Sequence, residues 1–513
     1  MTAIKREGWG ALAQFALLNA GVLLALAGVD NAARNGIVWA ETGFWLCLIG
    51  LYAPMFYRLL KVEVSRSERL GLVLVLGLSL YLVKVMHSPN GFTFHDELVH
   101  LRTVNDIALT GHLFKDNTII QVSPLYPGLH LATAAFAQIT GFGIFTSGVI
   151  VLALGRIVLV GSLFLLFETA SDSPRAAGIC TLLYMTTPNF IFFMSQFAYE
   201  SLALPLAALV IYTVSQRFRQ PEGQRVSANI ATVLLILTVA VTHHLTSYML
   251  ALFLVASGMI ALFWQRIASA ILSLQARLEK RAWYRRLLKI ALPPPHDLPD
   301  ALGTNPRPGF GWTAGIVVVI SLAWMMYVAK PTFNYLEPVF SDAFNEVVKI
   351  VQGDIQGRQL FASTTGDVRP AWEQITSLAS VGLAMLVLPF GILEIWRRRR
   401  DRMIALLLLL TGLVYPFSLA LRFTSKGWEI GNRSSEFLFV GVAYLCGIGL
   451  LSTWHKTQGT RWRLIFTAFG VMMLLGGLIA GWPYWARLPG TYLVSADTRS
   501  IEAHGVAVAK WAN

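Results

Sequence analysis

The chain is dominated by apolar stretches about as long as a helix that crosses a bilayer, which needs roughly 20 residues. About thirteen such stretches can be placed along the 513 residues. They lie near residues 9–29, 37–57, 70–87, 142–168, 176–194, 197–215, 227–242, 245–264, 313–329, 375–395, 403–421, 436–454 and 464–482. In lipid every backbone polar group needs a partner within the protein, and a helix provides these partners within one segment. The sequence therefore predicts an all-α polytopic membrane protein with about thirteen transmembrane helices.

Composition excludes several classes of protein. Hydrophobic residues make up 55% of the chain and charged residues 13%, whereas about a quarter of the residues of soluble domains are charged. A cytosolic enzyme, a disordered protein and a nucleic-acid reader are therefore excluded, and no nucleic-acid partner is expected. The three cysteines lie far apart within apolar stretches, so they offer neither a disulfide framework nor metal-ligand spacing.

The distribution of charge predicts the orientation of the chain. Lys and Arg concentrate in the cytoplasmic loops of membrane proteins. With a cytoplasmic N-terminus, roughly 26 of the 41 Lys and Arg residues fall on inward segments, where their simplest role is to orient the chain. We expect a multi-pass protein of the inner (plasma) membrane with its C-terminus outside. About 17 of the 28 acidic residues fall on the outward side, so function is expected at the extracytoplasmic face.

These assignments divide the chain into six regions. They are N-terminal transmembrane helices at 1–87, an outward candidate catalytic loop with a juxtamembrane helix at 88–141, a transmembrane core at 142–265, a basic cytoplasmic amphipathic loop at 266–312, C-terminal transmembrane helices at 313–482, and an outward tail at 483–513. The basic loop is expected to lie on the anionic inner leaflet. Within the C-terminal region, the outward loop at 330–374 is expected to form a helix near 338–351 and to cover the site.

The first outward loop places two adjacent carboxylates at the membrane surface. Asp96 and Glu97 follow the third apolar stretch and are flanked by His95 and His100, and charge at such a place is costly unless it is used. A carboxylate in a partly desolvated pocket can act as a general base toward an attacking hydroxyl. The alternative is that the pair caps a helix. The two histidines do not match a zinc-protease motif, because residues five apart do not share a helix face.

The same loop contains residues that predict a short helix and a turn. A short helix is expected from Asp96 to Gly111, because a glycine is suited to the position that follows a helix C-terminus. A turn is expected at Tyr126-Pro127-Gly128.

Further polar residues fall near the outer face. His243 and His244 interrupt apolar residues at an outward turn and are candidates for binding a phosphate or a hydroxyl, with local hydrogen bonding as the alternative. Glu200 lies in a very short outward turn, either beside the first loop or as a solvated turn residue.

The segment 422–436 holds three cations on the side that is otherwise acidic. Arg422 and Arg433 are suited to bidentate contact with a lipid phosphate, and Lys426 is a looser point charge. The alternative for Arg433 is a local pair with Glu436, three residues later.

Together these features resemble the GT-C superfamily of integral-membrane glycosyltransferases, in the layout of protein O-mannosyltransferases, oligosaccharyltransferases and lipid A aminoarabinose transferases. The resemblance depends on the carboxylate pair in the first large outward loop, on the juxtamembrane helix ending in Thr110-Gly111-His112-Leu113-Phe114, and on the Tyr126-Pro127-Gly128 turn. Here the acidic loop follows the third apolar stretch rather than the first, so the match requires two extra N-terminal helices.

The resemblance implies an inverting transfer of a sugar from a polyprenyl-phosphate donor to a hydroxyl of a glycan, lipid or protein acceptor, within cell-envelope polysaccharide biosynthesis. Asp96 would be the general base, and Glu97 would orient it or hold a metal or the acceptor. The donor phosphate would be bound by Arg422, Arg433, Lys426, His243 and His244. The acceptor or the sugar would be bound by His95, His100, Tyr126, Glu200 and Glu436. A divalent cation, Mg or Mn, is a candidate cofactor.

Two other functions stay open. A glycan polymerase or ligase using a diphosphate-linked oligosaccharide would depend more on outward Arg and His residues than on the carboxylate pair. A lipid-linked glycan flippase or transporter would favour paired charges in mid-helix or inverted repeats. Only Arg156 and Glu168 are clear charges within an apolar stretch or near its end.

Overall fold

The computed structural model shows a helical protein, in which helices are joined mostly by short turns. It describes residues 8–117, 119–216, 225–263, 309–352, 360–361, 368–399, 402–424, 427–454, 459–482 and 488–489, with isolated residues between 266 and 280 and between 507 and 511. The expected amphipathic segment of the basic loop and the outward tail lie largely outside the described residues.

Eight described helices are long and apolar enough to cross a membrane. They are α1 (Leu12–Arg34), α2 (Val38–Leu60), α3 (Arg66–His87), α6 (Ile144–Ser171), α16 (Ala371–Arg398), α17 (Met403–Ala420), α18 (Trp428–Trp454) and α19 (Thr460–Gly481). A ninth candidate combines α14 (Gly309–Tyr327) with the first residues of α15 (Pro331–Gln352), although the chain turns by 105° between them. The described part of the chain is thus that of a multi-pass membrane protein.

The remaining apolar stretches form helices that fail this test of length and composition. They are α7 (Pro174–Tyr184), α8 (Tyr199–Gln216), α9 (Arg225–Thr242) and α10 (His244–Leu262). Each of the thirteen expected stretches therefore contains a helix, while the number of them that cross the bilayer stays a prediction.

The stretch expected to form one helix at 176–194 does not. α7 ends at Tyr184, and the chain continues through turns into the short helix η2 (Phe193–Ser195). Pro188 lacks the backbone N–H that a helix needs, and the residue before a proline is disfavoured in the helical region. Arg156 of α6 donates hydrogen bonds from Nη2 to the Met194 carbonyl at 2.6 Å and to Ser195 Oγ at 2.8 Å. Irregular backbone at membrane depth is stable only where protein covers it, and this segment is largely buried.

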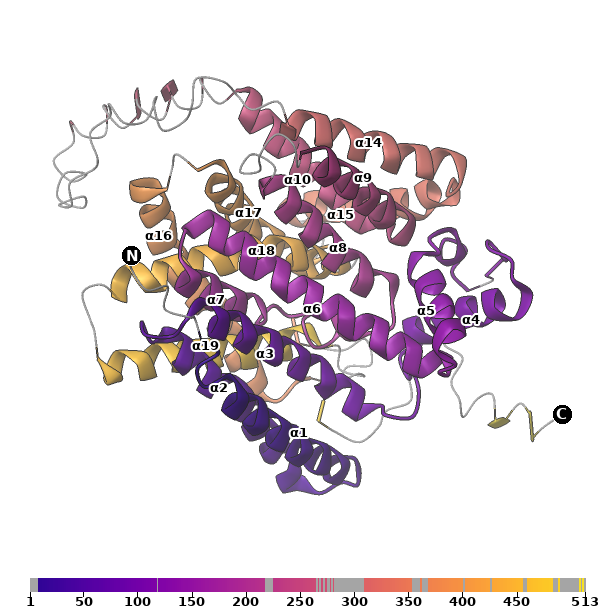
Figure 1. The fold of residues 1–513 in the computed structure, drawn as a ribbon, viewed down its shortest axis with the longest axis horizontal. Helices are drawn as coiled ribbons and strands as arrows, with labels where there is room; N and C mark the ends of the chain where they lie inside the picture. The colour runs from indigo at the N-terminus through magenta and orange to yellow at the C-terminus, as the bar shows by residue number, and fades with distance from the viewer. Residues whose placement is uncertain are drawn as a thin grey trace.

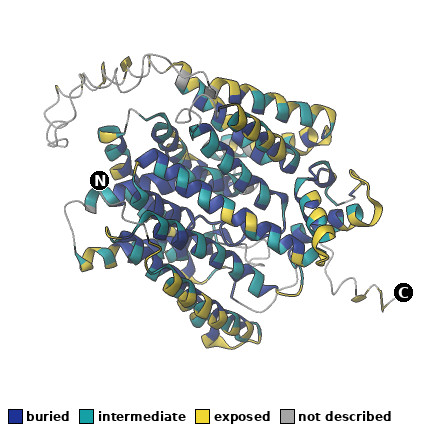
Figure 2. Ribbon diagram, viewed as in Figure 1, coloured by how far each residue is buried: buried dark blue, intermediate teal, exposed yellow. Residues whose placement is uncertain are grey.

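α18 is the central helix of the C-terminal half (Figure 1) and packs against α16, α17 and α7. Glycines permit its close contacts. A Cβ on Gly441 would overlap Gly412 and the Leu408 carbonyl, and one on Gly391 would overlap the Leu445 carbonyl. In Figure 2 the buried residues concentrate in these inner helices, whereas α1 shows many exposed positions. Those exposed apolar side chains form a surface suited to lipid.

The helices α8, α9, α10 and α14 form a second group of neighbours. Two shorter helices, α4 (His95–Thr110) and α5 (Gly128–Thr140), lie together at one end of α6 (Figure 1). α4 is the short helix expected from the sequence, and Gly111 follows it with φ of 69°, in the left-handed conformation that glycine adopts readily. The expected helix near 338–351 is the C-terminal part of α15.

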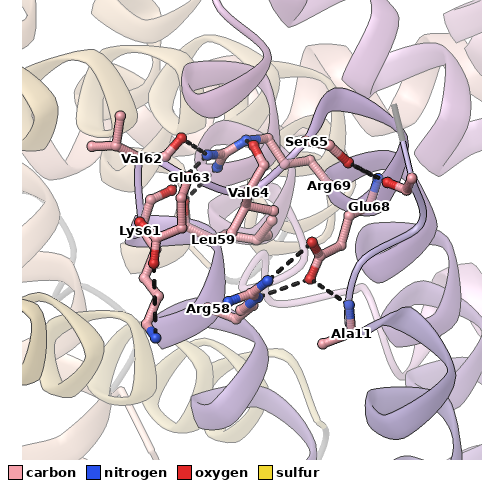
Figure 3. Close-up of polar contacts among 11 residues, drawn as sticks. Ala11, Arg58, Leu59, Lys61, Val62, Glu63, Val64, Ser65, Glu68 and Arg69 are labelled. Atoms are coloured by element: carbon pink, nitrogen blue, oxygen red, sulfur yellow. Dashed lines mark hydrogen bonds and ion pairs between the residues drawn. The ribbon is translucent and has the colours of Figure 1, made fainter. Parts of the chain in front are cut away.

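Two arginines at the ends of α2 and α3 stabilise the connection between these helices (Figure 3). Arg69 is buried and donates to the carbonyls of Leu59 at 2.6 Å, Lys61 at 2.6 Å and Val64 at 3.0 Å. These bonds satisfy carbonyls that have no partner within the helix at the end of α2. In the same figure Arg58 holds the buried carboxylate of Glu68 through two hydrogen bonds of 2.8 and 3.0 Å.

Candidate functional site

Glu97 is completely buried and anchors the start of α4. Its Oε1 forms a buried ion pair with Lys84 Nζ of α3 and accepts a hydrogen bond from the Phe197 amide at 2.9 Å. Its Oε2 accepts hydrogen bonds from the amides of Thr93 and Phe94 at 3.1 and 3.2 Å. The carboxylate thus ties α3, the N-terminus of α4 and the chain before α8 together, and the capping role considered for the carboxylate pair applies to this residue.

Asp96 has a different environment from its neighbour. Its side chain is 23% exposed, whereas that of Glu97 is 0% exposed. His95 Nε2 lies 3.4 Å from Asp96 Oδ1, and the ring of Tyr199 lies within electrostatic reach of the same carboxylate. Asp96 is therefore the solvent-accessible member of the pair.

The end of α3 is also held from α1. His87, its last residue, has Nδ1 3.0 Å from Asp30 Oδ2, and Arg34 Nε lies 3.3 Å from the same oxygen. The hydroxyls of Ser88 and Thr93 are 2.8 Å apart, so the turn between α3 and α4 is bonded within itself. The first helix of the chain is thereby connected to the segment that carries the carboxylate pair.

Aromatic rings from segments far apart in the sequence pack against one another near Asp96. We call these six residues the ring series: His130, His100, Tyr199, His243, His244 and Tyr126. Their successive centroid distances are 5.1, 4.5, 4.4, 4.8 and 5.1 Å, within the range of favourable aromatic pairs. The ring series brings α4, α5, α8 and the α9–α10 turn to one place.

The two histidines at one end of the ring series are neutral. His100 Nδ1 lies 2.9 Å from His130 Nε2 and 3.3 Å from Ser123 Oγ. Burial, His130 and the positive charge of Arg433 hold the pKa of His100 well below its usual value. Burial lowers the pKa of His130 to about 3. A neutral imidazole has one donor and one acceptor nitrogen, which suits it to bind hydroxyl groups.

Arg433 of α18 brings a positive charge to the ring series. Its charge acts on His100, His243 and His244. Its Nη1 lies 3.4 Å from Glu200 Oε2 of α8. The structure thus joins two residues that the sequence nominated from segments more than two hundred residues apart.

Glu436, three residues after Arg433, is completely buried. Its carboxylate interacts with Glu200, Arg433 and Asn189, and its backbone carbonyl accepts a hydrogen bond from Tyr184 OH at 3.1 Å. Two carboxylates and one guanidinium therefore share a space inside the helix bundle. The local pair considered for Arg433 and Glu436 is part of this larger group.

Arg422 lies at the other end of the cationic segment. Its Nη2 donates to Asn432 Oδ1 at 3.2 Å, and Asn189 Nδ2 donates to the Asn432 carbonyl at 2.9 Å. Arg422 therefore reaches the group around Glu436 only through neighbouring amides. Lys426 lies outside the described residues.

Tyr126 and His95 complete the candidates from the first loop. Tyr126 is buried, and its hydroxyl lies 3.1 Å from Thr332 Oγ1 at the start of α15. His95 begins α4 beside Asp96. The structure thus brings together all the nominated residues that it describes, with Arg422 at the margin.

The described residues do not offer a ready metal site. No three His, Cys, Asp or Glu side chains among them are grouped as metal ligands. The Glu97 carboxylate, one candidate ligand, is occupied by Lys84 and three backbone amides. A divalent cation stays a prediction.

Sequence reasoning missed several residues of the site. Lys84, in the last turn of an apolar stretch, could have been found, because charge at that depth is unusual. Tyr199 and Asn189 carry no such signal, since aromatic residues and single amides are common in this chain. His130 is one of ten histidines, and its position in the sequence does not show that it meets His100.

No family model matches the sequence, and no curated protein matches it. Solved structures with a similar course of the chain include the oligosaccharyltransferase AglB from Archaeoglobus fulgidus in complex with an inhibitory peptide and a dolichol-phosphate, at 11% identity and a TM-score of 0.47. The match covers 80% of this chain and 55% of AglB. A structure of the oligosaccharyltransferase from the same organism with Zn and sulfate matches at 12% identity and a TM-score of 0.47, covering 80% and 53% of the two chains.

ArnT from Cupriavidus metallidurans bound to undecaprenyl phosphate is similar at 12% identity and a TM-score of 0.45, with 80% of this chain and 76% of ArnT covered. The chain spans about half the length of the oligosaccharyltransferases that it matches. These likenesses have TM-scores below 0.5, so membership of the GT-C superfamily stays a prediction from the sequence. At such low identity they assign no role to a residue.

Proposed function

We propose that the chain is a membrane glycosyltransferase that moves a sugar from a polyprenyl-phosphate donor to an acceptor hydroxyl, with inversion, at the extracytoplasmic face of the inner membrane. The observation that supports this most is the meeting of an accessible carboxylate, Asp96, and a guanidinium, Arg433, at one series of aromatic rings. Transfer from a sugar phosphate needs both groups: a base for the attacking hydroxyl and a cation for the departing phosphate.

Asp96 is the base in this proposal. Its carboxylate accepts the proton of the acceptor hydroxyl while that oxygen forms a bond to the anomeric carbon. The bond from the anomeric carbon to the phosphate oxygen breaks with its electron pair, and polyprenyl phosphate leaves. Glu97 orients the base, because its ion pair with Lys84 and its three backbone bonds fix the start of α4.

Arg433 stabilises the departing phosphate, and His243 and His244 contribute donors beside it. Charge that develops on the phosphate as the bond breaks is where a fixed cation lowers the barrier most. In this proposal Arg422 and Lys426, which come earlier in the same sequence segment, are supporting cations. His95, His100 and Tyr126, with Glu200 and Glu436, are the candidates for hydroxyl groups of the sugar and the acceptor.

The test compares two aspartates on one helix. We expect Asp96→Asn, assayed in lipid nanodiscs with a panel of radiolabelled polyprenyl-phosphate sugars, to lower kcat at least about 100-fold, the usual size of a lost general base. Asp106→Asn, on the same helix and paired with Lys115 at 2.9 Å on the surface, should retain the parent rate. Transfer at the parent rate by Asp96→Asn would show that the base is wrong.

A lipid-linked glycan flippase is the second candidate, because several charges lie buried among the helices. Lys84, Glu97, Glu436 and Arg156 are all less than 6% exposed, and buried charge in membrane segments often marks a transport path. Proteoliposomes carrying a fluorescent polyprenyl-phosphate sugar separate the two functions. Movement of the lipid between leaflets by a protein that transfers no sugar supports the flippase, and sugar transfer without such movement supports the enzyme. A polymerase or ligase would instead transfer from a diphosphate-linked oligosaccharide in the same assay.

A further inference from the structure

The helix α15 has an apolar side and a polar side. Phe333, Leu336, Phe344 and Val348 are spaced by three, eight and four residues, which places them on one face of a helix. The opposite face carries exposed polar residues: Asn334, Asp342, Asn345 and Lys349. Phe333 is 61% exposed and Phe344 69% exposed, so the described protein leaves these rings uncovered.

The turn before α15 sets this helix nearly perpendicular to α14. α14 and the start of α15 meet at 105°. Val319, Leu322 and Met326 of α14 are exposed apolar residues, as expected of a helix that faces lipid. If α14 crosses the bilayer, a helix at nearly a right angle to it runs along the membrane plane.

The position of the end of α14 indicates how deep α15 lies in the membrane. Tyr327 is the last residue of α14 and is 82% exposed. Exposed tyrosines gather where the lipid headgroups begin. α15 starts four residues later, at Pro331, so it lies at the depth of the headgroups.

The first turn of α15 touches the candidate site. Thr332 is fully buried, with its hydroxyl 3.1 Å from that of Tyr126. Tyr335 packs edge-on against His244 with ring centroids 6.0 Å apart. Trp324 of α14 donates from Nε1 to the Leu125 carbonyl at 3.1 Å, which fixes the approach to this turn. α15 thus begins over the ring series and extends away from it.

We propose that α15 is an amphipathic helix lying in the outer interface of the bilayer, with Phe333 and Phe344 among the lipid chains, and that it borders the lateral path by which a lipid-linked donor reaches the site. Amphipathic helices with large apolar rings on one face bury that face about 5–10 Å into the boundary between headgroups and acyl chains. The membrane position stands by itself, whereas the role as a border of the donor path rests on the proposed function.

Spin labels test the membrane position. Single cysteines replace Phe333, Phe344, Asp342 and Asn345 in turn, in the full chain with Cys47, Cys180 and Cys446 changed to alanine, in nanodiscs of phosphatidylcholine and phosphatidylglycerol. We expect labels at 333 and 344 to collide often with oxygen and rarely with a water-soluble nickel chelate. Labels at 342 and 345 should show the reverse order.

Two outcomes would overturn this position. Equal collision with the nickel chelate at 344 and 345 would place both faces in water. Low collision with both reagents at 344 would mean that protein, either a second copy or another part of the chain, covers this face. Each variant is first checked by size-exclusion chromatography and thermal unfolding, so that a label pattern is read only from folded protein.

Kinetics test the role in the donor path. The double variant Phe333→Asn/Phe344→Asn should raise KM for a polyprenyl-phosphate sugar several-fold and leave kcat within about twofold, because both rings are exposed, neither has a catalytic role, and their loss removes only uniform binding. Asn345→Ser is the matched control and should change neither constant. An unchanged KM would refute this role. Absence of transfer by the parent protein would instead refute the proposed function, and the spin-label result would stand.

Discussion

Arg433 Nη1 lies 3.4 Å from Glu200 Oε2, and this ion pair joins α18 to α8 inside the helix bundle. Glu436 follows on α18 and shares the same space, so one guanidinium faces two carboxylates. Glu200 therefore pairs with the cation that the proposed donor phosphate would need. A phosphate that binds Arg433 would have to replace the carboxylate of Glu200 as its partner.

Removing the cation should destabilise the protein more than removing its partner. Arg433→Leu leaves two carboxylates without a guanidinium, and the loss of one member of a buried ion pair costs about 3–5 kcal/mol. Glu200→Gln should cost less, because Glu436 still accompanies Arg433. Thermal unfolding in detergent micelles measures both variants. Equal stability of the two would show that Glu436 contributes nothing to holding Arg433.

The ion pair between Lys84 and Glu97 should matter far more than an exposed pair nearby in the sequence. Their side chains are 6% and 0% exposed, so Lys84→Met should lower the free energy of unfolding by about 3–5 kcal/mol. Lys61→Met is the control, because the Lys61–Glu63 pair spans 3.9 Å with side chains 28% and 64% exposed. Its loss should cost less than about 1 kcal/mol. A similar loss in both variants would contradict the anchoring role of Glu97.

Stability should fall as pH is lowered from about 7.5 toward 5. The folded protein holds the pKa of His100 well below its usual value and that of His130 at about 3, whereas an unfolded chain takes up these protons near pH 6.5. Below that pH the unfolded state binds more protons, so stability decreases as pH falls. His130→Gln should flatten the dependence of Tm on pH. His112→Gln, at an exposed position of the same loop, controls for loss of a histidine and should keep the parent slope.

Two glycines should respond in opposite ways to a methyl group. A Cβ on Gly441 of α18 would overlap backbone atoms of α17, so Gly441→Ala should cost about 1–3 kcal/mol through overpacking. Gly315 of α14 has open space around it, and Gly315→Ala should be neutral or stabilise by up to about 1 kcal/mol. Chemical denaturation in mild detergent compares the pair. Tolerance of Gly441→Ala would mean that α17 and α18 are not in close contact.

The sequence predicted helices better than it predicted what interrupts them. Apolar stretches located each of the eight described helices that are long and apolar enough to cross a membrane, because burial in lipid imposes a length and a composition on the whole segment. The end of α7 was wrongly placed, because this helix stops at Tyr184 and the irregular backbone that follows is bonded at Met194 and Ser195 by Arg156 of α6. No pattern along one segment reports a partner that arrives from another helix.

The sequence identified candidate residues of the site but did not predict how they are arranged in space. Asp96, Arg433 and His244 were recognisable because polar residues near a membrane surface are costly. The edge-on contact of His244 with Tyr199, and the pairing of Arg433 with Glu200, follow from how α8, α10 and α18 pack. The sequence did not distinguish the roles of Asp96 and Glu97. In the structure Glu97 is buried against Lys84, whereas Asp96 stays accessible.

The contact between Asp30 and His87 limits which N-terminal helices can be replaced in a chimeric protein. The first two described helices, α1 and α2, form a hairpin that a protein engineer would consider deleting or exchanging as a unit. Here the first helix reaches the last residue of α3 with a buried carboxylate, only a short turn ahead of Asp96. Any chimera that replaces α1 and α2 must therefore supply an acid at the position of Asp30, or it will leave His87 unbonded beside the loop that carries the site.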